Sequence, residues 1–155
     1  MSYHWNWGIL LSPVSTGEPT TYLGWLMSGF WVTITVSLSA WVIALIVGSF
    51  FGVLRTVPNK WASGIGTLYV AIFRNIPLIV QFFIWYLVIP ELLPVSIGNW
   101  FKQLPPGAQF FSSSILCLGL FTAARVCEQV RSGINALPKG QRAAGLAMGF
   151  TQWQT

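Results

Sequence analysis

The chain has 155 residues, of which 54% are hydrophobic and 7% charged, and its formal net charge is +5. Soluble domains carry roughly 25% charged residues, so this composition excludes a water-facing globule and predicts a membrane protein. The length accommodates about three or four spanning helices, because each needs ~20 apolar residues plus connections. The basic residues lie singly between apolar segments, which argues against a nucleic-acid-binding face.

The first predicted spanning helix comprises residues 24–54 and contains no charged residue. It follows an N-terminal segment, residues 1–23, that lacks the cationic start and long apolar run of a cleaved signal. Gly48 and Gly52 form a GxxxG pattern, which lets a neighbouring helix approach closely. Helix packing is the simplest interpretation of that pattern.

The second predicted spanning helix comprises residues 62–90. Pro77 removes a backbone hydrogen bond, so we expect a kink near residues 73–77. Arg74 lies within this apolar stretch, where a charge is costly unless it faces protein, water or the interface. Either Arg74 reaches the interface or binds carbonyl groups freed by the kink, or it has a direct role in transport.

A loop with short interfacial pieces is predicted for residues 91–107, because four Pro and two Gly occur from Pro90 to Gly107. The third spanning helix is predicted at residues 108–131, followed by a final segment at 134–155. Two cysteines on this third helix are ten residues, and so roughly 15 Å, apart. That separation is too large for a disulfide, and both are expected to be buried thiols.

The positions of Lys and Arg predict the orientation. With three crossings, one side of the membrane receives six basic residues, the other receives Lys102 alone, and Arg74 lies within a helix. The positive-inside rule therefore places the N-terminus outside and the final segment in the cytoplasm. The six residues are Arg55, Lys60, Arg125, Arg131, Lys139 and Arg142.

No constellation of catalytic residues is apparent in the sequence. His4 is the only histidine and is expected to be a solvated or interfacial imidazole. The sequence therefore predicts neither a catalytic triad with histidine nor a histidine metal cluster. The acids Glu18, Glu91 and Glu128 are far apart in the chain, and no phosphate-binding GxxxxGK[ST] motif occurs. We therefore expect no enzymatic activity, no metal and no cofactor.

Two segments resemble a known family. The sequence FRNIPLIVQFFIWYLVIP at 73–90 resembles a segment of the permease subunits of bacterial polar amino-acid ABC importers (the histidine/glutamine/glutamate permease family), and AARVCEQVRSGINALPKGQRAAGLAMGFTQWQ at 123–154 resembles their cytoplasmic signature loop. Within the family, the chain is most similar to the permeases of glutamate/aspartate importers.

The resemblance implies an all-α type I ABC importer transmembrane domain in the bacterial inner membrane, with five spanning helices and a periplasmic N-terminus. It implies ATP-binding cassette ATPase subunits, a second permease subunit, identical or homologous, and a periplasmic amino-acid-binding protein as partners. About three spanning helices fit in this chain. The remaining two, and the second half of the signature, are expected beyond Thr155, as in an N-terminal fragment.

The resemblance also identifies a coupling helix that would dock on the ATPase. Small residues leave little bulk along this helix, so that a partner backbone can approach closely, and apolar side chains supply anchors. The family's usual Glu is replaced by Ala143, directly after Arg142. Without the resemblance, an interfacial helix on the lipid surface or the start of another span is the favoured interpretation. The coupling residues are Pro138, Gly140, Ala143, Ala144, Gly145 and Gly149.

Three residues are candidates for the substrate pathway: Arg125, Arg74 and Glu128. An acidic amino acid requires a counter-charge in a low-dielectric path, and arginine binds a carboxylate in a bidentate manner. Alternatively, Arg125 pairs with Glu128 at i,i+3 or only follows the positive-inside rule. Arg74 is the weaker candidate, because the family resemblance shows it irrespective of substrate.

The predicted function is that of a permease subunit for glutamate or aspartate, driven by ATP hydrolysis in a partner. The first alternative is a self-contained channel or secondary transporter for small anions, with Arg74 and Arg125 along the route. The absence of intramembrane acids disfavours proton coupling in such a transporter. The second alternative is a membrane-anchored assembly protein without a pathway.

Overall fold

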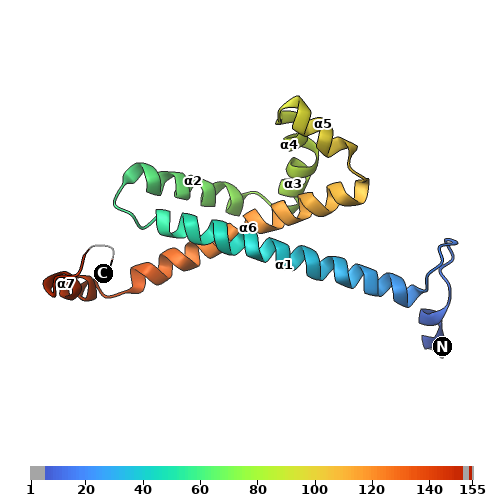
Figure 1. The fold of residues 1–155 in the computed structure, drawn as a ribbon, viewed down its shortest axis with the longest axis horizontal. Coiled ribbons are helices and arrows are strands. Elements are labelled where there is room, and N and C mark those ends of the chain that lie inside the picture. Colours follow the sequence, from blue (N-terminus) through green and yellow to red (C-terminus); the bar gives the residue numbers. More distant parts are fainter. Residues whose placement is uncertain (1–5, 152–153, 155) are drawn as a thin grey trace. The chain divides into compact units, whose positions relative to one another are not determined.

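A computed structural model describes residues 6–151 and 154, and only the backbone of residues 139 and 142. His4 lies outside these residues. The described chain contains helices and an isolated β-bridge but no strand, in agreement with the predicted all-α class. The elements are η1 (Trp7–Leu11), α1 (Tyr22–Leu54), α2 (Lys60–Asn75), α3 (Leu78–Phe83), the π-helix η2 (Ile84–Val88), α4 (Ile89–Leu92), α5 (Val95–Gln103), α6 (Pro106–Ala136) and α7 (Lys139–Ala147) (Figure 1).

The chain divides into two units, Met1–Leu38 and Ser39–Thr155. In the first unit, the segment after η1 folds back on itself through the bridge between Pro13 and Thr21. Gly17 has φ +81°, a conformation that glycine adopts without strain. The indole of Trp25 donates a hydrogen bond of 2.9 Å to Glu18 and so joins this turn to the start of α1.

In the second unit, α1 packs on α6 through small residues. Ala40, Ala44, Gly48 and Gly52 are buried and recur every fourth residue, so they share one helix face. A Cβ at Gly48 would lie 2.6 Å from the Cβ of Val126. The packing interpretation of the GxxxG pattern is therefore confirmed.

The helix predicted at residues 62–90 is broken instead of merely kinked. α2 ends at Asn75, α3 begins at Leu78, and the two directions differ by 105°. Figure 1 shows α3 turning away from α2. The position of the break agrees with the prediction, because Pro77 cannot donate to the preceding turn.

Gln81, and not Arg74, binds the carbonyl groups freed by this break. Its Nε2 donates to the carbonyls of Phe73 at 2.9 Å and Ile76 at 2.8 Å, and its side chain is buried. The interpretation of Arg74 as their donor is therefore wrong. A glutamine four residues after the proline lies one helical turn away, from where its amide reaches back over the end of α2.

The same arrangement occurs before α6. Gln109 follows Pro105 by four residues, and its Nε2 donates to the carbonyls of Lys102 at 3.1 Å and Leu104 at 2.7 Å. In the segment predicted as a loop at 91–107, α5 forms a nine-residue helix packed beside α4. The ammonium of Lys102 lies 2.6 Å from the carboxylate of Glu91 and joins the two helices.

Among the described residues, two helices, α1 and α6, are long and apolar enough to cross a membrane, and a third span results if α2 and the segment 78–92 are counted together. Cys117 and Cys127 are buried free thiols on the continuous helix α6, as predicted.

The centre of the second unit is formed where α2 packs on α6. Its buried residues are Val70, Ala124 and Cys127. The Tyr69 hydroxyl donates a hydrogen bond of 2.6 Å to the carbonyl of Leu120, which fixes α2 against the middle of α6.

Candidate substrate hollow and coupling helix

Arg55 and Glu128 form the best-shielded ion pair in the described chain. Arg55 directly follows α1, and its Nη1 lies 2.8 Å from the Glu128 carboxylate on α6. The Arg55 side chain is 7% exposed. Burial acts to lower the pKa of Arg55, but hydrogen bonds to Glu128 and Cys127 and the Glu128 charge raise it on balance, so the guanidinium remains charged.

Gly66 on α2 allows Arg55 to reach Glu128. A Cβ at Gly66 would lie 2.5 Å from the Cγ of Arg55. The aliphatic part of the arginine therefore passes directly over the glycine, where no larger residue fits without displacing it. The charged end of Arg55 then meets Glu128 beside the core between α2 and α6.

Among the described side chains, Glu128 has two further arginine partners, both more distant than Arg55. The Nη1 atoms of Arg74 and Arg131 each lie 3.6 Å from a Glu128 oxygen, an ion-pair distance beyond hydrogen-bond reach. Arg131, at i+3 from Glu128, takes the helical pairing that was considered for Arg125. In the described part of the chain, no carboxylate lies within 4.0 Å of an Arg125 nitrogen.

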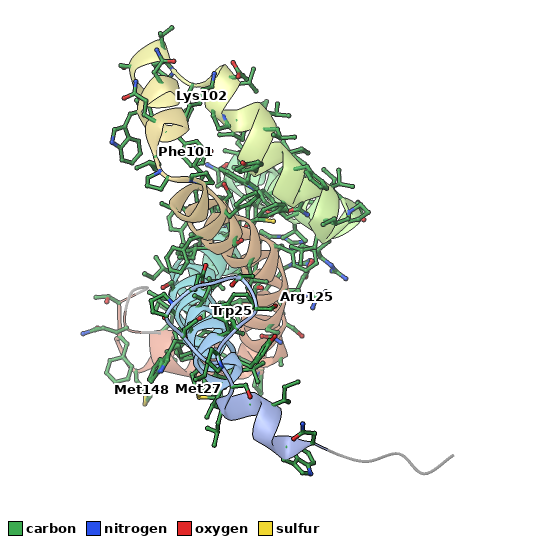
Figure 2. All side chains as sticks on the ribbon, turned by 90° about the vertical axis from the view of Figure 1, so that its right-hand side faces the viewer. Trp25, Met27, Phe101, Lys102, Arg125 and Met148 are labelled. Atoms are coloured by element: carbon green, nitrogen blue, oxygen red, sulfur yellow. The ribbon has the colours of Figure 1, made fainter. Side chains whose placement is uncertain are left out.

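Arg125 is instead placed over the ring of Phe121, with 4.7 Å from the guanidinium carbon to the ring centroid. This cation–π contact orients the guanidinium without neutralising its charge. Arg125 is exposed, and Figure 2 labels it where it projects from the ribbon of α6.

A hollow of about 350 Å³ is lined by Arg74, Phe121, Arg125 and Glu128. The three predicted pathway candidates therefore lie together, although 54 residues separate the first from the last (128 − 74). Arg74 comes from the end of α2 and the other three come from α6. The hollow carries two guanidiniums and one carboxylate.

Sequence reasoning missed the roles of Arg55 and Phe121. Arg55 was counted only among the basic residues that predict the orientation, and nothing local indicates a partner 73 residues away. Phe121 had a usable signal, because it precedes Arg125 by four residues and i,i+4 side chains meet on a helix. The described residues contain no group of three or more His, Cys, Asp or Glu side chains that could hold a metal ion.

The predicted coupling residues lie in and around α7. Pro138 occupies the position before the helix with φ −60°. Ala143 and Ala144 are exposed, whereas Gly145 is buried. A Cβ at Gly140 would meet nothing within 4 Å, so this part of α7 is open to a partner.

Gly149 has a backbone role in ending α7. Its φ is +86°, and its N–H donates to the carbonyl of Leu146 at 3.1 Å. The N–H of Phe150 donates to the carbonyl of Gly145 at 3.1 Å, which completes a Schellman motif. Any other residue at Gly149 would strain this helix end.

Apolar side chains beside this helix end are exposed. The exposed fractions are 43% for Leu146, 70% for Met148 and 49% for Phe150, and Figure 2 labels Met148. Because soluble surfaces rarely leave such residues clustered, the end of α7 is suited to contact with a partner.

Residues 44–155 match the family of binding-protein-dependent transport system inner membrane components. The chain belongs to this family. The match includes the second unit from Ala44 onward, and therefore the hollow and α7. The family description agrees with the apolar helices, and this inner membrane component is built as a type I ABC importer transmembrane domain.

Curated relatives support this membership. The chain is 68% identical over 152 residues to the glutamate/aspartate import permease protein GltJ of Escherichia coli strain K12, and 97% of the chain and 61% of GltJ are covered. It is 30% identical to the glutamate/aspartate import permease protein GltK of Escherichia coli O6:H1, with 86% and 58% covered. The chain therefore spans about three-fifths of the length of these relatives.

A solved structure agrees in fold. The crystal structure of an amino acid ABC transporter with histidines superposes with a TM-score of 0.66 at 24% identity, over 84% of this chain and 56% of that chain. At this level of identity, the superposition establishes the fold alone.

Proposed function

We propose that this inner membrane component forms part of the translocation pathway for acidic amino acids, glutamate and aspartate, across the bacterial inner membrane. The observation that carries the proposal is the 68% identity to a glutamate/aspartate import permease over nearly the whole chain. The hollow with Arg74 and Arg125 supports it, because an anionic substrate requires positive groups in a low-dielectric path.

Transport is driven by ATP hydrolysis in partner ATPase subunits, and α7 transmits the motion. The open space at Gly140 and the exposed apolar residues that follow support docking at this helix. A second permease subunit completes the pathway. The relative GltK, named as a glutamate/aspartate import permease, supports a homologous rather than an identical partner. A periplasmic amino-acid-binding protein delivers the substrate.

The N-terminus lies in the periplasm and α7 in the cytoplasm. The distribution of basic residues supports this orientation, because six Lys or Arg residues fall on the side of α7 and Lys102 alone falls on the other.

The test is uptake of radiolabelled glutamate by cells that express the full-length permease with its partner subunits. We expect uptake to stop when ATP is exhausted while the ion gradient is maintained. Uptake that continues under these conditions would instead support the secondary transporter or channel. Absence of glutamate uptake, with the proteins present in the membrane, would contradict the proposed function.

A matched pair of variants tests the role of α7. Gly140→Leu places a side chain where this chain has open space, so the fold is expected to tolerate it while a docked ATPase is displaced. Gly133→Leu, also at an open position but on α6, is the control. We expect Gly140→Leu to abolish glutamate uptake and ATPase copurification, and Gly133→Leu to retain both. If Gly140→Leu retained as much glutamate uptake as Gly133→Leu, α7 would be excluded as the docking helix.

A further inference from the structure

The hollow beside α6 contains three charged groups of two kinds. Arg74 and Arg125 each present a guanidinium, Glu128 presents a carboxylate, and Phe121 supplies an apolar wall. The three groups sum to a charge of +1. An acidic α-amino acid has two carboxylates and one ammonium, and therefore a net charge of −1 at neutral pH. The two guanidiniums of the hollow therefore match the two carboxylates of the ligand, and the one carboxylate of the hollow matches its ammonium.

Both guanidiniums retain free hydrogen-bonding capacity. Arg125 has only the ring of Phe121 as a partner among the described contacts. Arg74 is 55% exposed, and its one ion pair within the described part of the chain is 3.6 Å long, which is too long for a hydrogen bond. Each guanidinium can therefore bind a carboxylate in a bidentate manner without breaking a hydrogen bond within the chain.

The carboxylate of Glu128 is held in place and still has capacity for a ligand. One oxygen accepts the hydrogen bond from Arg55, whereas the other lies 3.6 Å from Arg131. An ionised carboxylate accepts about four hydrogen bonds, so an ammonium can bind beside these arginines. Arg55, which does not line the hollow, acts as a positioning residue for Glu128.

We propose that this hollow binds an acidic α-amino acid by all three of its charges, with the two carboxylates on Arg74 and Arg125 and the ammonium on Glu128. This inference rests on the proposed function and makes the hollow a specificity-determining site. A neutral amino acid leaves one guanidinium unpaired. A dicarboxylate without the ammonium has no cation to pair with the carboxylate of Glu128. Both mismatches weaken binding.

The first experiment changes the ligand and leaves the protein intact. The purified full-length permease, with its partner permease and ATPase but without the binding protein, is placed in nanodiscs of zwitterionic lipid, so that no anionic headgroup competes. Binding of radiolabelled glutamate is then displaced by glutamate, aspartate, glutamine or glutarate. We expect glutamine, which lacks the second carboxylate, and glutarate, which lacks the ammonium, to compete at least about tenfold more weakly than glutamate.

The second experiment removes one positive charge at a time. Arg125→Gln removes a charge from the hollow, and Lys60→Gln removes one from an exposed position at the start of α2, outside the hollow. We expect Arg125→Gln to weaken glutamate binding about tenfold or more and to abolish the preference over glutamine, whereas Lys60→Gln stays near the wild type.

Three results would overturn the inference. Glutarate that competes as well as glutamate would exclude Glu128 as the ammonium site, and unchanged selectivity in Arg125→Gln would exclude Arg125. Absence of saturable glutamate binding would exclude the hollow altogether. If the same wild-type transporter nevertheless imports glutamate with its binding protein, the proposed function stands and only the site is wrong. If it imports no glutamate, the proposed function itself fails.

Discussion

At the scale of single residues, Glu128 accepts a hydrogen bond from a shielded arginine and lies near two others. Removing the carboxylate would leave Arg55, which is 7% exposed, without its counter-charge. An uncompensated buried charge is far more costly than a broken surface pair. Glu128 pairs with the shielded Arg55, whereas Glu91 belongs to a surface pair, so the two acids can be compared directly.

We expect Glu128→Leu to lower the free energy of unfolding by about 3 kcal/mol. Glu91→Leu breaks the 2.6 Å pair with Lys102, in which Glu91 is 66% and Lys102 44% exposed. This change should lower the free energy of unfolding by less than about 1 kcal/mol. Denaturant titration of the full-length permease in detergent micelles measures both. Equal losses would show that the shielding of Arg55 is energetically unimportant.

At the scale of elements, the contact between α1 and α6 depends on the absence of side chains. At Gly48, an added Cβ would meet the carbonyl oxygen of Ala123 at 2.7 Å as well as the side chain of Val126. A side-chain clash can be relieved by a rotamer change, whereas a backbone clash requires the helices to separate.

Gly48→Ala should therefore destabilise the permease by about 1–3 kcal/mol through overpacking. The matched control is Gly64→Ala on α2, where an added Cβ meets nothing within 4 Å. That control should be neutral or stabilising by up to about 1 kcal/mol, because alanine is the better helix former. The shift in unfolding free energy of each variant is the measurement, and a neutral Gly48→Ala would contradict the close packing.

The break between α2 and α3 is stabilised by the buried side-chain amide of Gln81. Gln81→Met should destabilise the permease by about 1–3 kcal/mol, because it leaves the carbonyls of Phe73 and Ile76 without their donor in a buried place. Gln109→Met removes an equivalent pair of hydrogen bonds at a more exposed position and should have a smaller effect. The difference between the two unfolding free energies is decisive, and a larger loss at Gln109 would refute the explanation from burial.

At the scale of the whole molecule, the proposed topology can be tested by cysteine labelling. Both cysteines of this chain are buried, and any further cysteine of the full-length permease is first replaced by serine, so an introduced thiol supplies the signal. A membrane-impermeant maleimide should label Thr16→Cys in cells with a permeable outer membrane, and Gln141→Cys only after the inner membrane is opened. Both positions are exposed in this chain. The reverse pattern would invert the proposed orientation.

Local features of the sequence determined much of the architecture. The long apolar stretches and few charges predict an all-α membrane protein, since only apolar helices with internally satisfied backbones cross the bilayer in this way. Pro77 located the break, and Gly48 with Gly52 located a helix contact, because a proline and a small-residue pattern act on their own turns. The signature resemblance located the coupling segment around α7.

Only the tertiary structure decided which distant residues meet. Arg55 finds Glu128 because Gly66 opens a passage between α2 and α6. Gln81, and not Arg74, is the donor at the break, so the Arg74 guanidinium is left exposed in the lining of the hollow. These pairings depend on how the helices pack, and contacts across 54 or 73 residues leave no periodic or local mark on the chain. The charges of the hollow were therefore visible in the sequence, but their assembly into one site was not.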